Sequence, residues 1–356
     1  MISILLDNIY FIFTKTLSAL QKDFILNILY TMNDFQKIFT KALALAPMED
    51  VTEPPFRFIS KRLGADILYT EFISSEALIR DATKAKAKLF YYAEERPIGI
   101  QIFGGAVDVM IDAAKISEDA NPDFIDINCG CWVKDVALRG AGAGLLKDLP
   151  RMKLLAESVV KNVSKPVTLK TRLGWDRDNI VIVDVAKMMV DIGIQALTVH
   201  CRVRGQGNKG DADWEWVKRV KDSGVQIPIV LNGNIKTPED VKFVFENFQP
   251  DAVMIGQGAI SNPWIFRQTK YFLEHGVHEP LPGFEERIDT CVEHLQLAVA
   301  LKGEKLGVRE FRKHYSGYFH SIPNIAKFRL ELMQFDVSEP IINKLIDFKN
   351  NYCNIT

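Results

Sequence analysis

Short apolar runs alternate with longer amphipathic segments through most of this chain. Runs without polar alternation indicate strands buried on both faces, which is typical of a parallel sheet. The pattern therefore predicts an α/β fold. The runs are rich in Val, Ile and Leu and lie at residues 42–48, 65–72, 97–103, 123–129, 166–171, 195–201, 227–233 and 251–257. Segments of helical period lie between them at residues 107–120, 151–163, 180–192, 214–222 and 238–245.

The number of strand–helix units favours a closed barrel. Eight such units in succession predict a (β/α)8 TIM barrel. A doubly wound open sheet is the alternative, but no Gly-x-Gly-x-x-Gly follows the first strand. One helix start is explicit, because Thr237 can cap it, Pro238 suits its first position and Glu239 and Asp240 favour its first turn.

The strand signal stops near Leu281, where Pro280, Pro282 and Gly283 break the pattern. Beyond it, residues 285–301, 308–320 and 340–348 have helical character. We therefore expect a barrel over residues 32–280, followed by a small C-terminal helical domain over residues 281–356.

Residues 1–31 form an N-terminal extension whose status the sequence leaves open. Asp7, Lys15, Lys22 and Asp23 interrupt its apolar runs, so no segment reaches the ~18 residues of a membrane-spanning helix. It also lacks the features of a signal peptide. Our hypothesis is a misassigned start upstream of Met32. The alternative is a real amphipathic helix that associates weakly with membranes; we expect no stable membrane association.

Composition excludes few classes of protein. The chain has 356 residues, 47% of them hydrophobic, and can bury a large core without cross-links. Five cysteines do not suggest a disulfide framework, so we expect a reducing, cytoplasmic location. A net charge of −1 gives no overall electrostatic argument for binding nucleic acid.

Nearly every predicted strand ends in a residue that can form a hydrogen bond. In a TIM barrel these ends form the rim that carries function. Any one of them could be a structural cap, but a ring of them at one rim favours a ligand. They are Pro47-Met48, Glu71, Gln101, Asn128 with Cys131, Lys170 with Arg172, His200 with Arg202, Asn232-Gly233-Asn234 and Gly256-Gln257-Gly258.

The last two strand ends favour a phosphate-bearing cofactor. Loops after strands seven and eight commonly form a barrel's phosphate site, and their glycines let backbone N–H groups approach an anion. Residues 261–263 then predict a helix whose N-terminus favours negative charge. Lys170 could stabilise the charge of a reduced flavin, and Gln101 could hydrogen-bond its polar edge. A salt bridge from Lys170 to Glu71, and a purely structural His200, remain alternatives.

Cys129-Gly130-Cys131 allows three interpretations. Cys-x-Cys is not the usual zinc spacing, and no second ligand pair stands nearby, so we expect no metal. A disulfide between these two residues would need a strained short loop. The third interpretation is a catalytic thiol. Cys129 ends the strand, whereas Cys131 lies on the rim loop, where it can face a substrate.

Seven ordered motifs across residues 42–330 resemble the tRNA-dihydrouridine synthase family. They are ALAPMEDVTEPPFR, PIGIQIFG, DINCGCWVKDV with RGAGAGLL, VTLKTRLGW, LTVHCRVR with KGDADWEWV, LNGNI and IGQGAISNPWIF. The segment VREFRKHYSGYF in the helical tail is similar to that family's tRNA-binding domain.

The resemblance implies an enzyme that reduces the C5–C6 bond of a tRNA uridine with NADPH or NADH through FMN. It implies that Cys131 is the proton donor. It also implies a tRNA partner rather than DNA, and we expect a monomer. The implied FMN-binding residues are Pro47, Met48, Glu49, Gln101, Lys170, His200, Asn232, Gly233, Asn234, Gly256 and Gln257. The implied substrate and RNA contacts are Asn128, Arg172, Arg202 and Arg204, with Arg312 and Lys313 in the helical tail.

The chain departs from the family pattern in its loops. Trp132 replaces the proline of Gly-Cys-Pro, and Glu49-Asp50 replaces Ala-Gly after Met48. Asn234 stands for an aspartate, and Gln257 replaces the arginine of Gly-Arg-Gly. Loss of that arginine puts cofactor affinity in question more than cofactor identity.

The helical tail carries the charge argument for RNA. Residues 301–330 hold seven Lys and Arg against two Glu, with aromatic residues interleaved. The alternative is that these charges belong to a solvent-exposed helix face that binds no RNA. Rival functions are an FMN barrel enzyme that acts on a free small molecule, such as a dihydroorotate dehydrogenase, and a non-catalytic RNA-binding barrel. The position of the modified uridine is not readable from the sequence.

Overall fold

The computed structural model describes residues 34–320, 322 and 325–353. The proposed extension at residues 1–31 lies outside them. No helix within the described residues is both long and apolar enough to cross a membrane.

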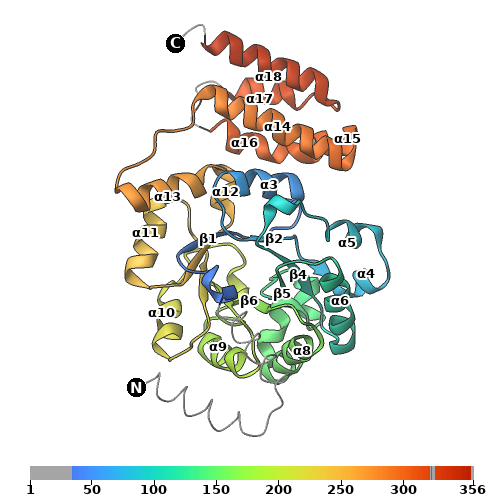
Figure 1. Cartoon of the computed structure of the whole chain (residues 1–356), viewed down its shortest axis with the longest axis vertical. Coiled ribbons are helices and arrows are strands. Elements are labelled where there is room, and N and C mark those ends of the chain that lie inside the picture. Colours follow the sequence, from blue (N-terminus) through green and yellow to red (C-terminus); the bar gives the residue numbers. More distant parts are fainter. Residues whose placement is uncertain (1–33, 321, 323–324, 354–356) are drawn as a thin grey trace, which may run out of the picture.

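Parallel strands form a barrel, as predicted (Figure 1). They pair in the order β1-β9-β8-β7-β6-β5-β4-β2, with β3 beside β4. A parallel bridge between Ala44 and Ile67 brings the two ends of the sheet together, so β2 and β3 share the second barrel position. The strands are β1 (Ala42–Leu45), β2 (Leu68–Tyr69), β3 (Ile73–Ser74), β4 (Ile98–Phe103), β5 (Phe124–Cys129), β6 (Val167–Arg172), β7 (Leu197–His200), β8 (Ile229–Asn232) and β9 (Ala252–Ile255).

Helices surround the barrel, and their apolar faces pack on continuously buried strands. Thr237 caps α11 as predicted, because its side chain accepts a hydrogen bond from the Asp240 N–H. The helices are α3 (Pro54–Arg62), α4 (Ser75–Ile79), α5 (Thr83–Ala87), α6 (Val107–Asp119), α7 (Lys134–Leu138), α8 (Leu149–Asn162), α9 (Ile182–Asp191), α10 (Glu215–Asp222), α11 (Pro238–Asn247), α12 (Gln257–Ser261) and α13 (Ile265–His275). Short 3-10 turns lie at η1 (Ala93–Glu95), η2 (Gly142–Lys147) and η3 (Arg204–Gln206).

The C-terminal region is helical, also as predicted (Figure 1). The helix expected over residues 308–320 is broken, however, by a 3-10 turn before a short helix in which Gly317 lies against the Ile260 carbonyl. The helix α17 was not predicted. The elements are α14 (Phe284–Lys302), α15 (Glu304–Phe311), η4 (Arg312–His314), α16 (Tyr315–Tyr318), α17 (Ile325–Leu332) and α18 (Ser338–Cys353).

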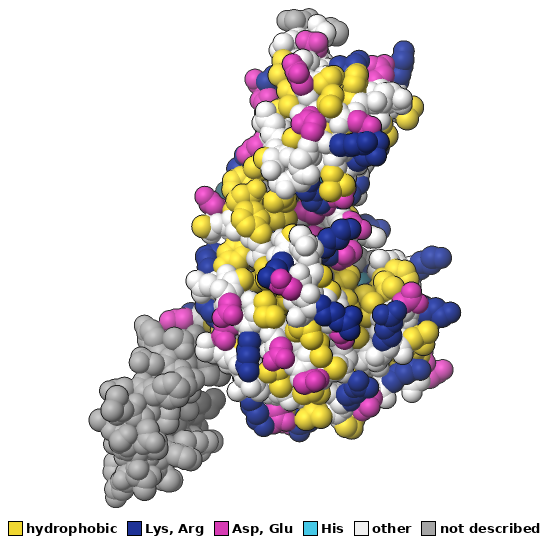
Figure 2. Space-filling view, turned by 90° about the vertical axis from the view of Figure 1, so that its right-hand side faces the viewer, with side chains coloured by type: hydrophobic (Ala, Val, Ile, Leu, Met, Phe, Trp, Pro, Cys, Tyr) yellow, Lys and Arg dark blue, Asp and Glu magenta, His cyan; other side chains and the backbone are white. Residues whose placement is uncertain are grey.

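The helical region shares a hydrophobic core with the barrel. Ile59 of α3 and Leu63 at its C-terminal end, with Trp264, pack against apolar side chains of the C-terminal helices. Ion pairs support the same junction, including Lys302 with Glu53 at 2.7 Å. Figure 2 shows hydrophobic side chains gathered on the surface where the two parts meet. This packing fixes the C-terminal helices on one side of the barrel, next to α3 and α12.

Candidate active site

A pocket of about 400 Å³ opens at the carboxyl ends of the strands. This volume lies within the range of small-molecule and cofactor sites. Most residues predicted from the strand ends line it: Pro47, Met48, Glu49, Asn128, Cys131, Lys170, Arg172, His200, Arg202, Asn232, Gly233, Asn234, Gly256 and Gln257. Gln101, Arg204, Arg312 and Lys313 are not among its lining residues.

The loop after β5 separates its two cysteines. Cys129 is fully buried in the barrel core, whereas Cys131 lines the pocket and is 8% exposed. Neither forms a disulfide among the described residues. Burial raises the pKa of the Cys131 thiol, an effect that the Val133 N–H and Arg172 oppose. At neutral pH Cys131 therefore presents a protonated thiol, which is the form of a proton donor.

A buried hydrogen-bond chain supports the Cys131 loop from below. The Gln101 amide donates to Asp126 at 2.6 Å, and its oxygen accepts from the Asn128 amide at 2.8 Å. The Asn128 oxygen then accepts from the backbone N–H groups of Gly130 and Cys131, both at 2.9 Å. Because a carboxylate can only accept, Asp126 sets the direction of every bond in this chain.

The Gln101 side chain is already hydrogen-bonded within the protein. Both ends of its amide are occupied, and the side chain is fully buried outside the pocket lining. Its hydrogen bond to a flavin stays a prediction and would require Gln101 to exchange one of these two partners. The position of Gln101 at a strand end could not reveal this, because its partner Asp126 lies beside it on the neighbouring strand β5.

Lys170 is a buried cation without a partner. It is 9% exposed and lines the pocket, and its ammonium has no hydrogen bond or ion pair among the residues that the structure describes. The anticipated alternative partner, Glu71, instead contacts Lys88 at 3.7 Å. Burial, then repulsion from Arg172, lowers the Lys170 pKa to about 8. An unpaired buried cation facing a cavity favours an anionic ligand.

Arg172 fastens two rim loops to each other. Its guanidinium donates to the Gly130 carbonyl at 2.9 Å and to the Gly207 carbonyl at 2.7 Å, and only 2% of the residue is exposed. Burial lowers the Arg172 pKa to about 10, still well above neutral. Its donors are thus largely used within the protein, where Arg172 holds the loop that carries Cys131. Its contact to RNA or cofactor phosphate stays a prediction.

His200 is neutral in this setting. Burial, followed by the charges of Arg172, Lys170 and Arg202, holds the pKa of His200 well below its usual range. Its Nε2 lies 3.1 Å from an Arg202 nitrogen, so it can accept a hydrogen bond there. Arg202 also donates to the Gly210 carbonyl at 2.8 Å and to the Asn234 oxygen. Both residues remain in the pocket lining.

The loops after β8 and β9 form a close-fitting cradle. Gly233 has φ +114°, and a Cβ there would lie 3.0 Å from the His200 ring, so only glycine fits. Asn234 adopts φ +60°, a conformation that asparagine tolerates. The helix expected to open at residues 261–263 is preceded by α12, which already begins at Gln257. Lys236, which we did not predict, lines the pocket beside these loops and supplies a cation where Gln257 supplies none.

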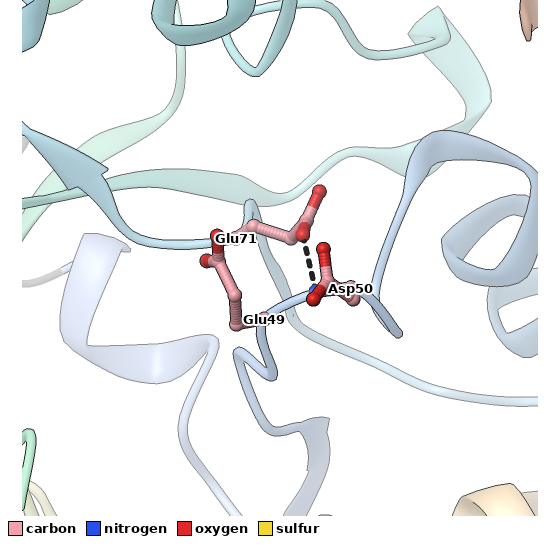
Figure 3. A group of neighbouring side chains, drawn as sticks. All are labelled: Glu49, Asp50 and Glu71. Atoms are coloured by element: carbon pink, nitrogen blue, oxygen red, sulfur yellow. Dashed lines mark hydrogen bonds between the residues drawn. The ribbon is translucent and has the colours of Figure 1, made fainter. Parts of the chain in front are cut away.

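An acidic group borders the pocket (Figure 3). Carboxylate oxygens of Glu49, Asp50 and Glu71 lie within 4.8 Å of one another, and Glu71 accepts from the Asp50 N–H at 2.7 Å. Lys88 pairs with Glu49 at 2.5 Å and partly neutralises the group. Asp50 adopts φ +59°, which explains how it can stand where the resembled family has glycine.

The two predicted RNA contacts of the helical tail are engaged within the protein. Arg312 pairs with Asp336 at 2.9 Å, and Lys313 pairs with Glu53 at 3.2 Å. Arg204 lies outside the pocket and contacts the Trp175 ring. The tail's basic residues are therefore less available than their count suggests.

Several lining residues were missed by sequence reasoning. They come from loops beyond the strand ends, where no periodic pattern marks orientation; for Trp132 the departure from the family motif was the available signal. They are Phe72, Trp132, Asn208 and Lys236.

Comparisons with known proteins agree with this geometry. The "Dihydrouridine synthase (Dus)" family model matches residues 44–352. The chain is 38% identical over 289 residues to "tRNA-dihydrouridine synthase B" of Pseudomonas aeruginosa, covering 81% of this chain and 87% of that protein. It is 35% identical over 313 residues to "Probable tRNA-dihydrouridine synthase" of Rickettsia bellii, covering 88% and 96%.

Solved structures support the fold. A 2-naphthoyl-CoA reductase complex matches with TM-score 0.51 at 11% identity, over 65% of this chain and 50% of that one. A structure of TcOYE matches with TM-score 0.50 at 12% identity, over 68% and 91%. With the family model covering most of the chain and curated relatives matching along most of their length, this chain belongs to the dihydrouridine synthase family.

Proposed function

We propose that this protein is a flavin-dependent oxidoreductase that uses FMN, with NADPH or NADH as reductant, to reduce the C5–C6 double bond of a uridine in tRNA. One observation carries the proposal: the protonated Cys131 thiol and the unpartnered Lys170 ammonium line the same rim pocket. A proton donor and an anion-binding cation in one cavity suit the reduction of a polarised double bond.

The residues around the pocket fit FMN. Lys170 and Lys236 offer positive charge, and the close-fitting glycine at Gly233 lets the backbone approach a phosphate. The apolar side chain of Met48 can face a ring system. The residues that would hold the cofactor are Pro47, Met48, Glu49, Lys170, His200, Asn232, Gly233, Asn234, Lys236, Gly256 and Gln257.

When bound and reduced by NADPH or NADH, FMN would supply a hydride to C6 of the uracil. Cys131 would donate its Sγ proton to C5, and its raised pKa keeps that proton in place at neutral pH. Asn128 holds the Cys131 loop through two backbone hydrogen bonds, and Arg172 fixes the same loop through the Gly130 carbonyl. Lys170 would attract the electron-rich edge of the flavin. The target base must leave its stack to enter the pocket.

The wider organisation is part of the proposal. Residues 32–280 would form the FMN-binding barrel and residues 281–356 the tRNA-binding helical domain. Arg312 and Lys313 would contact RNA only by exchanging their present partners, Asp336 and Glu53. Cysteines 129, 131, 201 and 291 are unpaired, which suits a reducing cytoplasm. We propose a monomer that binds tRNA and not DNA.

The test separates tRNA from small-molecule substrates. Purified protein is incubated with FMN, either NADPH or NADH, and one of three substrates: tRNA lacking dihydrouridine, free uridine or orotate-like pyrimidines. We expect dihydrouridine in tRNA only. Reduction of a free pyrimidine with no change in tRNA would overturn the substrate assignment, and a protein that binds no FMN would overturn the cofactor assignment.

A further inference from the structure

An exposed tryptophan marks the edge of the pocket mouth. Trp132 lines the pocket and is 43% exposed. Gly207, in the loop after β7, adopts φ +56°, and a Cβ built there would lie 3.3 Å from the Trp132 ring. The Gly207 backbone therefore supports the indole closely. Arg172 fixes Gly207 in turn by donating to its carbonyl at 2.7 Å. The Trp132 ring is thus held against a fixed loop, with much of its surface open.

A second tryptophan, Trp175, lies on the loop after β6. The Arg204 N–H donates to the Gly174 carbonyl at 2.9 Å, and the Gly205 N–H donates to the Trp175 carbonyl at 3.0 Å. These bonds join the loop after β6 to η3. The Trp175 ring carries two cations: the Lys147 ammonium lies 4.1 Å from its centroid and the Arg204 guanidinium carbon 4.6 Å. Both cations therefore pack on the Trp175 ring.

Neither cation is neutralised. Within residues 34–320, 322 and 325–353, no carboxylate pairs with Lys147 or Arg204. The Arg204 Nε is buried without any hydrogen-bond partner there. The neighbouring Arg172 and Arg202, by contrast, donate hydrogen bonds to backbone carbonyls. Two cations on one ring, neither with a carboxylate partner and one with an unsatisfied donor, favour an anionic ligand.

We propose that Trp132, Lys147, Trp175 and Arg204 form a track that binds the tRNA strand flanking the reduced uridine, with a base stacked on Trp132 and a phosphate held by Lys147 and Arg204. The proposal rests on the proposed function. Extruding the target uridine leaves a neighbouring base free to stack on an aromatic surface. The adjacent backbone then brings a negative charge to the two cations.

A phosphate of the nicotinamide reductant is the competing occupant of the cation pair. The reductant's phosphate would bind Lys147 and Arg204 in the absence of tRNA, and its binding would not depend on a base stacked on Trp132. The variants therefore distinguish the two occupants. Loss of affinity for tRNA indicates the RNA strand, whereas loss of affinity for NADPH indicates the reductant.

The experiment compares three variants with a matched control in the full-length, FMN-loaded protein. The variants are Trp132→Ala, Trp132→Tyr and the double variant Lys147→Gln/Arg204→Gln. Arg219→Gln is the control, because Arg219 also packs on a tryptophan, Trp216, at 4.4 Å, but on the outer helix α10. Equilibrium tRNA binding over a salt series, KM and kcat for tRNA, and KM for NADPH without tRNA are measured.

We expect Trp132→Ala to weaken tRNA binding roughly 5- to 150-fold, and Trp132→Tyr to recover most of the loss. The double variant should lower the log–log salt slope by about 0.7–0.9, as one lost phosphate contact does. KM for tRNA should rise with little change in kcat, and the control should match wild type.

An unchanged salt slope and unchanged tRNA affinity in both sets of variants would overturn the track while leaving an active enzyme. A raised KM for NADPH with unaltered tRNA affinity would also overturn it, in favour of the reductant. If the wild-type protein forms no dihydrouridine in tRNA, the proposed function itself fails, which is a distinguishable result.

Discussion

Exchanging the two ends of the buried chain Asp126–Gln101–Asn128 should cost less stability than the two single exchanges added together. The chain is directional, because Asp126 accepts from the Gln101 amide and Asn128 donates to the Gln101 oxygen. Asn128→Asp alone leaves two acceptors facing each other. Asp126→Asn alone keeps the chain only if its new amide turns to the Thr168 hydroxyl, which donates to Asp126 in the native protein. In Asp126→Asn/Asn128→Asp, Gln101 can turn over, and every bond along the chain can form again in the opposite direction.

The single substitutions have opposing effects that the structure allows us to weigh. Burial raises the Asp126 pKa from 3.8 to about 6, so the folded state disfavours the carboxylate. Stability is lost as pH rises from about 4 to 6, by roughly 3 kcal/mol in all, and the loss is complete at pH 7.5. Asp126→Asn relieves this penalty but weakens the hydrogen bond with Thr168 or leaves a buried donor unsatisfied, at about 1–3 kcal/mol. Its net effect should therefore be small, so the single variant is uninformative alone.

The double-mutant cycle isolates the hydrogen-bond polarity. We expect a favourable coupling free energy of about 1–3 kcal/mol between positions 126 and 128, measured by urea unfolding at pH 7.5. Asn232→Asp provides a matched control, because Asn232 is a rim asparagine whose amide donates to the Met254 carbonyl and shares no partner with Asp126. Its cycle with Asp126→Asn should be additive. Additivity within about 0.3–0.5 kcal/mol for the 126/128 pair would refute the directional chain.

Three further predictions concern charge. Lys170→Met should weaken FMN binding, measured by flavin fluorescence titration; wild-type affinity should fall above pH 8, where Lys170 loses its proton, and a variant with the same pH dependence would contradict this. His314→Phe should reduce acid sensitivity in urea unfolding, because burial lowers the His314 pKa and the neutral folded form loses about 1.4 kcal/mol of stability per pH unit below about 6.5; an unaltered acid slope would count against it. In the helical tail, Lys305→Gln/Lys327→Gln should lower the salt slope of tRNA binding more than Arg312→Gln/Lys313→Gln, since Arg312 and Lys313 have carboxylate partners; the reverse order would restore the sequence-based assignment.

The barrel was predictable because its strands are continuous apolar runs, and the pairing of β1 with β9 follows from the fold's closure. The positions of Cys129 and Cys131 were also predictable, since one ends a strand and the other follows a glycine. The break at Arg312–His314 was not, because no glycine or proline stands at these three positions to mark it.

The positions of the site residues were predictable from the sequence, but their hydrogen-bond partners were not. Strand ends identified the lining residues, because parallel strands deliver their carboxyl ends to one rim. They did not reveal that Gln101 and Arg172 direct their polar atoms to Asp126, Asn128 and loop carbonyls. Residue type fixes what a side chain can donate or accept, but only the assembled loops decide which neighbour receives it.

The central claim is that Cys131 protonates the uracil ring in this pocket. The most direct measurement runs the reaction in D2O on tRNA lacking dihydrouridine and locates deuterium in the product nucleoside by mass spectrometry and NMR. Wild-type protein and Cys129→Ala should form dihydrouridine with solvent deuterium at C5. Cys131→Ala should retain FMN and its reduction by NADPH but lose product formation about 10²–10⁴-fold. Product formation by Cys131→Ala at the wild-type rate would contradict the account.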